Sequence, residues 1–282
     1  MLGVCSLFVP ASAPRMINAS FTFSANSLIF DLEDSVSLEE KDSARILLQE
    51  ALPLLSELTD THIAIRINSE DELWQEDLEL LRTNLVQTVV IPKAKTNRLK
   101  EIAAKLDQMN IDTRIAAIIE DTQSLEELSH IATATSRITS LLLGAEDFSF
   151  DLGVERTMEG EEIRYARMRI ANAAAAHGLE ALDTPYVDTK DFEGLAQEAR
   201  YVKGLGFTGK LAISPLQIEI IQSIFNPTEH ELRWAALVVE AANLPENQGK
   251  GAFSLHGKMV DLPVIRRAEK ILARSAGKGE QL

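Results

Sequence analysis

Cysteine is scarce in this sequence, since Cys5 is the only one among 282 residues. A single cysteine excludes an internal disulfide and fits a reducing cytosol, so we expect a cytoplasmic protein. No apolar run approaches the roughly 20 residues of a membrane-spanning helix. The sequence also lacks a phosphate-binding loop, a dinucleotide-binding glycine fingerprint and a nucleophile elbow, and no Cys or His pair has zinc-site spacing. These absences exclude several common kinds of enzyme site.

Positive charge is also in short supply. The chain has 28 Lys and Arg against 43 Asp and Glu, which gives a net charge of −15. Such an acidic chain repels nucleic acids and anionic membranes, so we expect neither as a partner. An anionic substrate would need a locally positive site, made by a metal ion or by a few Arg and Lys side chains.

The length is close to the roughly 250 residues of one (β/α)₈ barrel. Short apolar runs alternate with helical patterns, which is typical of a parallel sheet with crossover helices. The predicted strands are Val4–Val9, Leu28–Asp31, His62–Ile67, Thr88–Ile91, Arg114–Ile119, Ser140–Leu143, Glu180–Leu182 and Lys210–Ile213. The predicted helices include Leu38–Leu55, Leu73–Leu85, Arg98–Met109, Ser124–Thr133, Glu161–Ala176 and Phe192–Leu205. Eight such units predict an α/β fold, a TIM barrel.

A C-terminal helical extension follows the predicted barrel. We expect the barrel to cover residues 1–225 and the extension to cover residues 226–282. Thr228–Asn243 and Leu262–Ala276 have helical patterns, and the glycine-rich segment Asn247–Lys258 between them is predicted to be irregular. Because such a segment suits a mobile cover, we interpret this region as a lid. The tail Gly277–Leu282 is predicted to fray.

Charged residues follow the predicted strands, where a TIM barrel carries its chemistry. Carboxylates dominate this set, together with one Arg and one Lys. The set is Asp31, Glu33, Asp34, Arg66, Lys93, Glu120, Asp147 and Asp183. Clusters of carboxylate oxygens suit Mg²⁺, which takes one or two carboxylates, waters and substrate oxygens.

Each of these residues also has a structural interpretation. Glu120 and Asp147 could cap helices, and Arg66 could pair with Glu33 or Asp34 to hold the barrel rim. Lys93 could be a surface lysine, and Asp183 could begin a turn. Their joint placement at one barrel mouth favours a functional site, but the spacing alone leaves both interpretations open.

Several motifs resemble those of the citrate lyase β-subunit and its CoA-lyase relatives in the HpcH/HpaI aldolase/citrate lyase family. They occur in the family's order from residue 5 to about residue 275. The motifs are Leu7–Pro10, Phe30–Val36, Arg66–Asn68, Ile91–Lys93, Gly144–Phe148, Lys210–Pro215 and Gly257–Pro263. Together they are specific for the family and less so for the substrate.

The resemblance implies a role for each candidate residue. It implies that Glu120 and Asp147 bind Mg²⁺ and that Arg66 holds the carboxylate of an oxo-acid such as oxaloacetate. Asp31, Glu33, Asp34 and Lys93 are implied to belong to the same mouth, where the acids also orient substrate and metal-bound water. In the family, the residue matching Asp261 lies on the lid and can reach the active site of a neighbouring subunit. Members form homotrimers or homohexamers.

The sequence departs from the family pattern at a few positions. Val4 replaces an Arg that is usual just before the first strand, where a base could contact the thioester carrier. Cys5, Ala11 and Ser214 replace a common Ser, Gly and His. The identity of the carrier, CoA or an acyl-carrier protein, therefore stays open.

The resemblance implies a carbon–carbon lyase that cleaves a 3-hydroxyacyl thioester, such as citryl thioester, into an oxo-acid and an acyl thioester. Arg66 and Lys93 would supply positive charge, and Asp261 would transfer a proton to the enolate carbon. A malyl-CoA or citramalyl-CoA lyase, or a thioesterase of the same family, is the alternative. A non-catalytic assembly subunit is an alternative of another class. Asp261 has a structural interpretation too, because it lies at the N-cap position of the last predicted helix.

Overall fold

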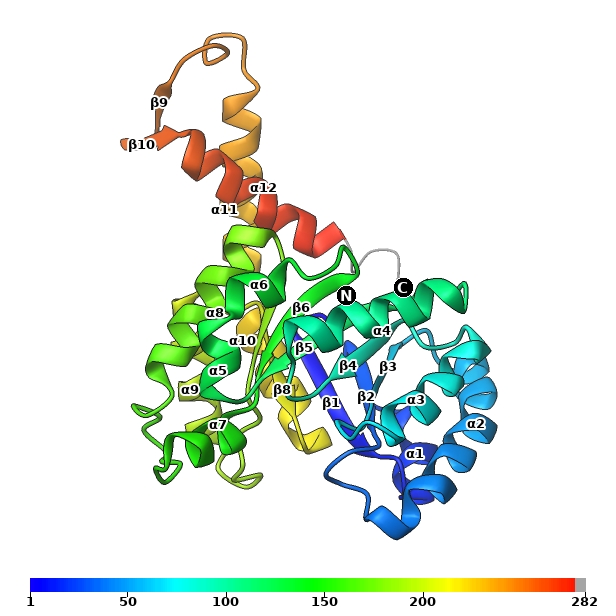
Figure 1. Ribbon diagram of the computed structural model, residues 1–282. Helices are drawn as coiled ribbons and strands as arrows, with labels where there is room; N and C mark the ends of the chain where they lie inside the picture. Colours follow the sequence, from blue (N-terminus) through cyan, green and yellow to red (C-terminus); the bar gives the residue numbers. More distant parts are fainter. Residues whose placement is uncertain (277–282) are drawn as a thin grey trace. The chain divides into compact units, whose positions relative to one another are not determined.

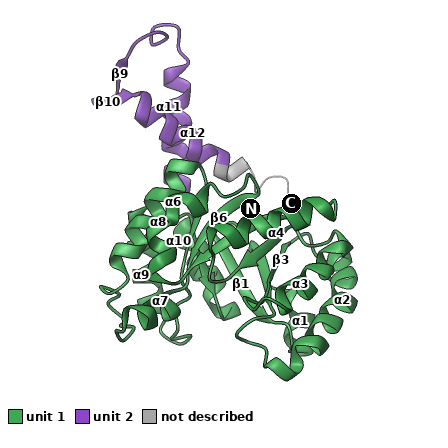
Figure 2. Ribbon diagram, in the orientation of Figure 1, with its two compact units in different colours: residues 1–225 green, residues 226–282 purple. Residues whose placement is uncertain are grey.

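The computed structural model describes residues 1–276, and the side chains of residues 1–273. The tail that was predicted to fray, residues 277–282, lies outside the described residues. The chain divides into two compact units, Met1–Phe225 and Asn226–Leu282 (Figure 2). Within residues 1–276, no helix is long and apolar enough to cross a membrane.

The first unit is a closed parallel barrel, as predicted (Figure 1). Each strand pairs in parallel with the next along the chain, and the last closes on the first. The strands are β1 Cys5–Pro10, β2 Ser27–Asp31, β3 His62–Arg66, β4 Thr88–Ile91, β5 Arg114–Ile119, β6 Ile138–Leu143, β7 Glu180–Asp183 and β8 Gly209–Ala212. The predicted strands agree within two residues at each end.

Alternate residues of each strand point inward and outward, which explains the near-continuous apolar runs. The inner core of the barrel contains Ile29, Ala64, Val90, Ala116, Ile118, Leu142, Leu182 and Leu211. The outward positions, such as Phe30 and Ile65, pack against the helices in a larger core. This alternation also decides which strand-end residues face the barrel mouth.

Helices cover the outside of the barrel (Figure 1). They are α1 Pro14–Ser20, α2 Lys41–Leu58, α3 Leu73–Asp77, α4 Thr96–Gln108, α5 Thr122–Glu126, α6 Leu128–Ala132, α7 Ala145–Leu152, α8 Arg164–His177, α9 Phe192–Leu205 and α10 Ile218–Phe225. The single helix predicted over Leu73–Leu85 was wrong, because α3 continues as a 3₁₀ helix over Leu78–Thr83. The helix predicted over Ser124–Thr133 is divided at Glu127, whose backbone leaves helical geometry.

The second unit contains α11 Glu229–Ala242, β9 Ala252–Leu255, β10 Lys258–Asp261 and α12 Leu262–Ala276. The prediction that residues 247–258 are irregular was wrong for the hairpin of β9 and β10. Leu255 pairs with Lys258, and the two turn residues His256 and Gly257 both have positive φ angles, 49° and 75°. Such a turn matches the twist of a two-residue hairpin, and glycine at its second position favours it.

Candidate active site

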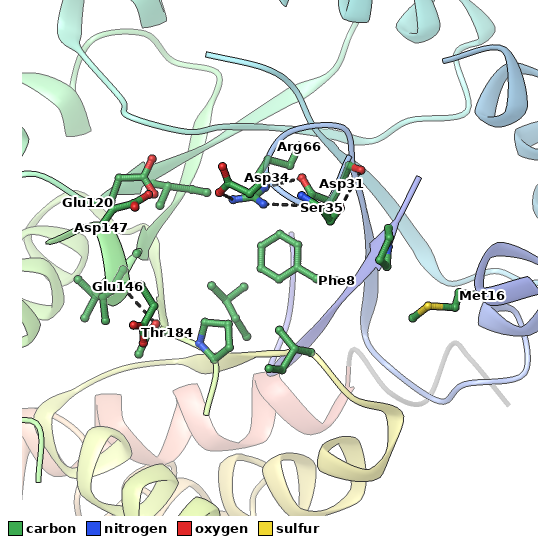
Figure 3. Close-up of a pocket in the computed structure, with 18 residues that line it drawn as sticks. Phe8, Met16, Asp31, Asp34, Ser35, Arg66, Glu120, Glu146, Asp147 and Thr184 are labelled. Carbon is green, nitrogen blue, oxygen red and sulfur yellow. Dashed lines mark hydrogen bonds and ion pairs between the residues drawn. The ribbon is translucent and has the colours of Figure 1, made fainter. Parts of the chain in front are cut away.

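A cavity of about 450 Å³ lies at the carboxyl ends of the barrel strands (Figure 3). Five of the residues predicted from the sequence line it: Asp31, Asp34, Arg66, Glu120 and Asp147. Glu33 and Lys93 contact members of this group. The structure therefore brings seven of the eight predicted strand-end residues together at one mouth.

Arg66 forms a two-point ion pair with Asp31 within the mouth. The two residues end β3 and β2 and are register partners, on the same face as inward-pointing Ala64 and Ile29. Arg66 Nε lies 2.6 Å from Asp31 Oδ1, and Arg66 Nη2 lies 2.7 Å from Asp31 Oδ2. Burial opposes ionisation of Asp31, but hydrogen bonds and the charge of Arg66 hold its pKa below the usual value.

The aromatic ring of Phe8 lies against the Arg66 guanidinium, with 5.1 Å between Cζ and the ring centroid. Phe8 was not among the predicted site residues. Phe8 belongs to the Leu7–Pro10 motif on β1, but the family resemblance implies no role for its ring. Its position on β1 was the one feature of the sequence that could have indicated this contact. This contact favours a fixed orientation of the guanidinium.

Glu33 is a buried acid between two cations. Its Oε2 lies 3.1 Å from Arg66 Nη1, and its Oε1 lies 3.6 Å from Lys93 Nζ. Neither oxygen has a hydrogen-bond partner within the described residues. Burial, above all, raises the pKa of Glu33 to about 7, and the neighbouring cations only partly oppose this rise.

Glu120 follows β5 and is buried beside Gly144. Its Oε1 accepts a hydrogen bond from the backbone N–H of Lys93, whose φ angle is 45°. A Cβ atom at Gly144 would lie 2.6 Å from Glu120 Oε2, so only glycine leaves room for this carboxylate. Burial and the negative charge of Glu33 raise the pKa of Glu120 to about 8.

Asp147 lies in the first turn of α7, beside Glu120 (Figure 3). The sequence did not predict α7, because its short pattern follows a strand directly. Burial and the nearby acids Glu33 and Asp147 raise the pKa of Glu120, and Arg66 only partly opposes the rise. No three His, Cys, Asp or Glu side chains converge as a metal site in the part of the chain that the structure describes. These residues fit Mg²⁺, which needs only one or two carboxylates when water and substrate supply the other oxygens.

Asp183 does not face the cavity, so the expectation that it joins the mouth was wrong. Its neighbour Leu182 points into the barrel, and Asp183 points outward toward α8 and α9. Arg167 Nε and Lys210 Nζ lie 2.8 and 2.6 Å from its oxygens, and Lys210 also contacts Glu198. These cations hold the pKa of Asp183 below its usual value against strong desolvation.

The buried charges also support the cavity wall. Lys210 Nζ donates a hydrogen bond of 2.6 Å to the carbonyl of Thr184, a residue that lines the cavity. Sequence reasoning missed Lys210, Arg167 and Glu198. Lys210 belongs to the Lys210–Pro215 motif. The one sign of its buried role in the sequence was a lysine inside an otherwise apolar strand.

Val4 precedes β1 and therefore lies at the amino end of the barrel strands. A strand of six residues spans about 20 Å, which separates Val4 from the carboxyl-end mouth. Val4 therefore lies away from the cavity residues, and the identity of the carrier stays open. Val4 is partly buried against the barrel core.

Asp261 ends β10 in the second unit, and its Oδ1 accepts a hydrogen bond of 3.2 Å from the N–H of Val264. Asp261 thus caps α12, as its structural interpretation predicted. Its catalytic role stays a prediction.

Residues 5–215 match the model of the HpcH/HpaI aldolase/citrate lyase family. The chain belongs to this family. The citrate lyase subunit beta of Haemophilus influenzae is 39% identical over 280 residues, which cover 95% of each protein. The mitochondrial citramalyl-CoA lyase of Rattus norvegicus is 29% identical over 286 residues, covering 94% of this chain and 84% of that protein.

Solved structures of this family share the fold. CitE from Mycobacterium tuberculosis, in complex with magnesium, acetoacetate and coenzyme A, aligns with a TM-score of 0.78. It is 32% identical and covers 98% of both chains. The chain is therefore a lyase of the citrate lyase type within the HpcH/HpaI family, and magnesium binding occurs in this family.

Proposed function

We propose that the chain is a Mg²⁺-dependent lyase that cleaves citryl thioester to oxaloacetate and an acetyl thioester. The observation that carries this proposal is the shared cavity of Arg66, Glu120 and Asp147. A forked cation and two carboxylates that line one cavity suit a substrate with a carboxylate beside a hydroxyl and a bound Mg²⁺. The 39% identity to a citrate lyase subunit beta supports the choice of citryl thioester.

In this proposal, each cavity residue has one task. Glu120 and Asp147 would hold Mg²⁺, which lowers the pKa of the substrate hydroxyl by Lewis acidity. Arg66 binds the carboxylate on the hydroxyl-bearing carbon and orients that carbon for cleavage. The ammonium of Lys93 adds positive potential at the rim. Asp31, which lines the cavity, and Glu33, which contacts Arg66 and Lys93 beside it, orient the substrate and its water molecules.

Cleavage breaks the carbon–carbon bond next to the hydroxyl carbon. The hydroxyl becomes a ketone as its proton passes to a carboxylate of the mouth or to water, and the bonding electrons form the enolate of the thioester. Asp261 protonates the enolate carbon, from the lid of its own subunit or of a neighbouring one in a homotrimer or homohexamer.

The test is an assay of purified protein with citryl-, malyl- and citramalyl-CoA, with and without EDTA. The proposal predicts EDTA-sensitive cleavage that is fastest for citryl thioester. The citryl test is repeated with the acyl group on an acyl-carrier protein, which identifies the carrier. If the protein cleaves none of the three thioesters under any condition, it is an assembly subunit, and the proposal is overturned.

The relative that is a citramalyl-CoA lyase favours a second candidate function. Citramalyl-CoA has a methyl group where citryl-CoA has a carboxymethyl group, so the two substrates differ by one negative charge. Preferential cleavage of citramalyl-CoA would replace the citryl assignment while leaving the lyase chemistry intact.

A further inference from the structure

The guanidinium of Arg66 has one edge that its permanent partners leave available. Asp31 occupies Nε and one hydrogen of Nη2, and Phe8 lies against one face. Both hydrogens of Nη1 and one of Nη2 remain. Asp34 Oδ2 accepts a hydrogen bond from Nη1 at 3.2 Å. A carboxylate that approached Arg66 end-on would need the position that Asp34 occupies.

Asp31 and Asp34 differ sharply in how firmly they are held. The Asp31 side chain is 3% exposed and also accepts hydrogen bonds from the backbone N–H groups of Glu33 and Ser35. The Asp34 side chain is 62% exposed. An exposed ion pair of this kind shifts an equilibrium by only about 1.4- to 5-fold, so a ligand carboxylate can replace Asp34 but not Asp31.

Glu33 does not fill the same position. Its Oε2 lies 3.1 Å from Arg66 Nη1, but it forms no hydrogen bond within the described residues. Glu33 is therefore a buried neighbour of Nη1 without a hydrogen bond to it, whereas the exposed Asp34 accepts one.

We propose that Asp34 is a displaceable counter-carboxylate that occupies the substrate edge of Arg66 until the carboxylate of the substrate replaces it. This inference rests on the proposed function, in which Arg66 binds that carboxylate. Asp34 is then a specificity residue and not a direct substrate contact. A neutral ester or amide cannot replace a charge-assisted hydrogen bond, so Asp34 disfavours such ligands.

The experiment measures binding of pyruvate at saturating Mg²⁺ by titration calorimetry. Pyruvate keeps the carboxylate and keto oxygen and does not decarboxylate during the titration. Asp34→Asn removes the competing charge, and we expect it to tighten pyruvate binding about 2- to 5-fold. Glu146→Gln is the matched control, because Glu146 lines the same cavity without an interaction with Arg66. We expect it to tighten binding clearly less.

Equal tightening in both variants would indicate a general charge effect and overturn the inference. Unchanged or weaker binding by Asp34→Asn would overturn it as well. Asp34→Ser, with thermal unfolding of every variant, repeats the test if Asp34→Asn folds poorly. Arg66→Lys distinguishes a failure of the role proposed for Asp34 from a failure of the role proposed for Arg66. If it binds pyruvate as tightly as the wild type, or if the wild type binds none, the role proposed for Arg66 fails and the inference fails with it.

Discussion

Asp31 and Arg66 end neighbouring strands in register, and their side chains meet at 2.6 and 2.7 Å through two parallel hydrogen bonds. The pair fixes the guanidinium because both side chains are nearly buried. A lysine at position 66 would keep the charge but lose this two-point geometry.

We expect Arg66→Lys to lower kcat/KM about 10- to 100-fold, which is the loss of one or two charge-assisted hydrogen bonds. Steady-state kinetics with the preferred thioester measure this change. Arg114→Lys makes the same substitution at an exposed position at the start of β5 and should leave kcat/KM near the wild-type value. Equal kinetics for the two variants would remove Arg66 from the site.

Glu120 makes the metal-free barrel less stable as the pH rises. Its pKa is raised from 4.5 to about 8, so between these values the folded protein holds a proton that the unfolded chain releases. The free energy of unfolding therefore falls as the pH increases through this window. Glu120→Gln removes the titration, and we expect its advantage in Tm over the wild type to grow from pH 5 to pH 8. Thermal unfolding in EDTA measures it.

The control for Glu120 is Glu126→Gln, since the Glu126 side chain is 74% exposed. This neutral substitution at an exposed position should change Tm little at either pH. A constant difference for Glu120→Gln as well would contradict the raised pKa of Glu120.

Gly144→Ala tests the space that Glu120 requires. The added Cβ would meet Glu120 Oε2 at 2.6 Å and displace the carboxylate. We expect Mg²⁺ affinity to fall about 10- to 100-fold, as for other changes that disturb the support of a metal ligand. Gly204→Ala is the matched substitution, because no atom lies within 4 Å of a Cβ at this position of α9. Calorimetric titration with Mg²⁺ should find Gly204→Ala unaffected, and an equal affinity for both variants would refute the packing argument.

Lys210→Met tests the buried charges behind the cavity wall. The variant would leave Asp183 and Glu198 without one of their cations, and we expect a loss of about 3–5 kcal/mol in the free energy of unfolding. Urea unfolding measures the loss. Lys190→Met, at an exposed position, should change the free energy by less than about 0.5 kcal/mol. If Lys210→Met also lowers the free energy of unfolding by less than about 0.5 kcal/mol, the ion pairs of Lys210 stabilise the fold no more than a packed methionine does.

Asp261 requires two variants, because it caps α12. Serine retains the cap and alanine removes it, at a cost of about 0.5–2 kcal/mol. If Asp261 transfers a proton, both variants should lose activity about 10²- to 10⁴-fold, while Tm falls only for Asp261→Ala. Kinetics and thermal unfolding together decide this, since a purely structural Asp261 predicts an active Asp261→Ser.

The barrel was predictable from the sequence because its strands are short apolar runs bounded by polar residues. Thr88–Ile91 and Arg114–Ile119 were predicted with their observed bounds. The β9–β10 hairpin was missed because glycine-rich flanks weakened a short and partly exposed pattern. Its signal was the glycine that follows His256, which permits the positive φ angle of the turn.

The direction of a strand-end side chain explains which candidates reached the mouth. Glu120 lies two residues after inward-pointing Ile118, so it also faces inward. Asp183 follows inward-pointing Leu182 and therefore faces the helices. The approximate end of a strand can be predicted, but an error of one residue reverses the direction of its last side chain. For this reason the cavity residues were predictable as a group, and the burial of Asp183 was not.

The left-handed backbone of Lys93 limits how this position can vary. Its φ angle of 45° aims the N–H at Glu120, and β-branched residues adopt that conformation only with strain. In a library that randomises position 93, we therefore expect selection to deplete Val, Ile and Thr most strongly. Asn and Gly would survive more often, even though they lack the positive charge. The accessible variation at this position is thus set by its main chain as well as by its ammonium group.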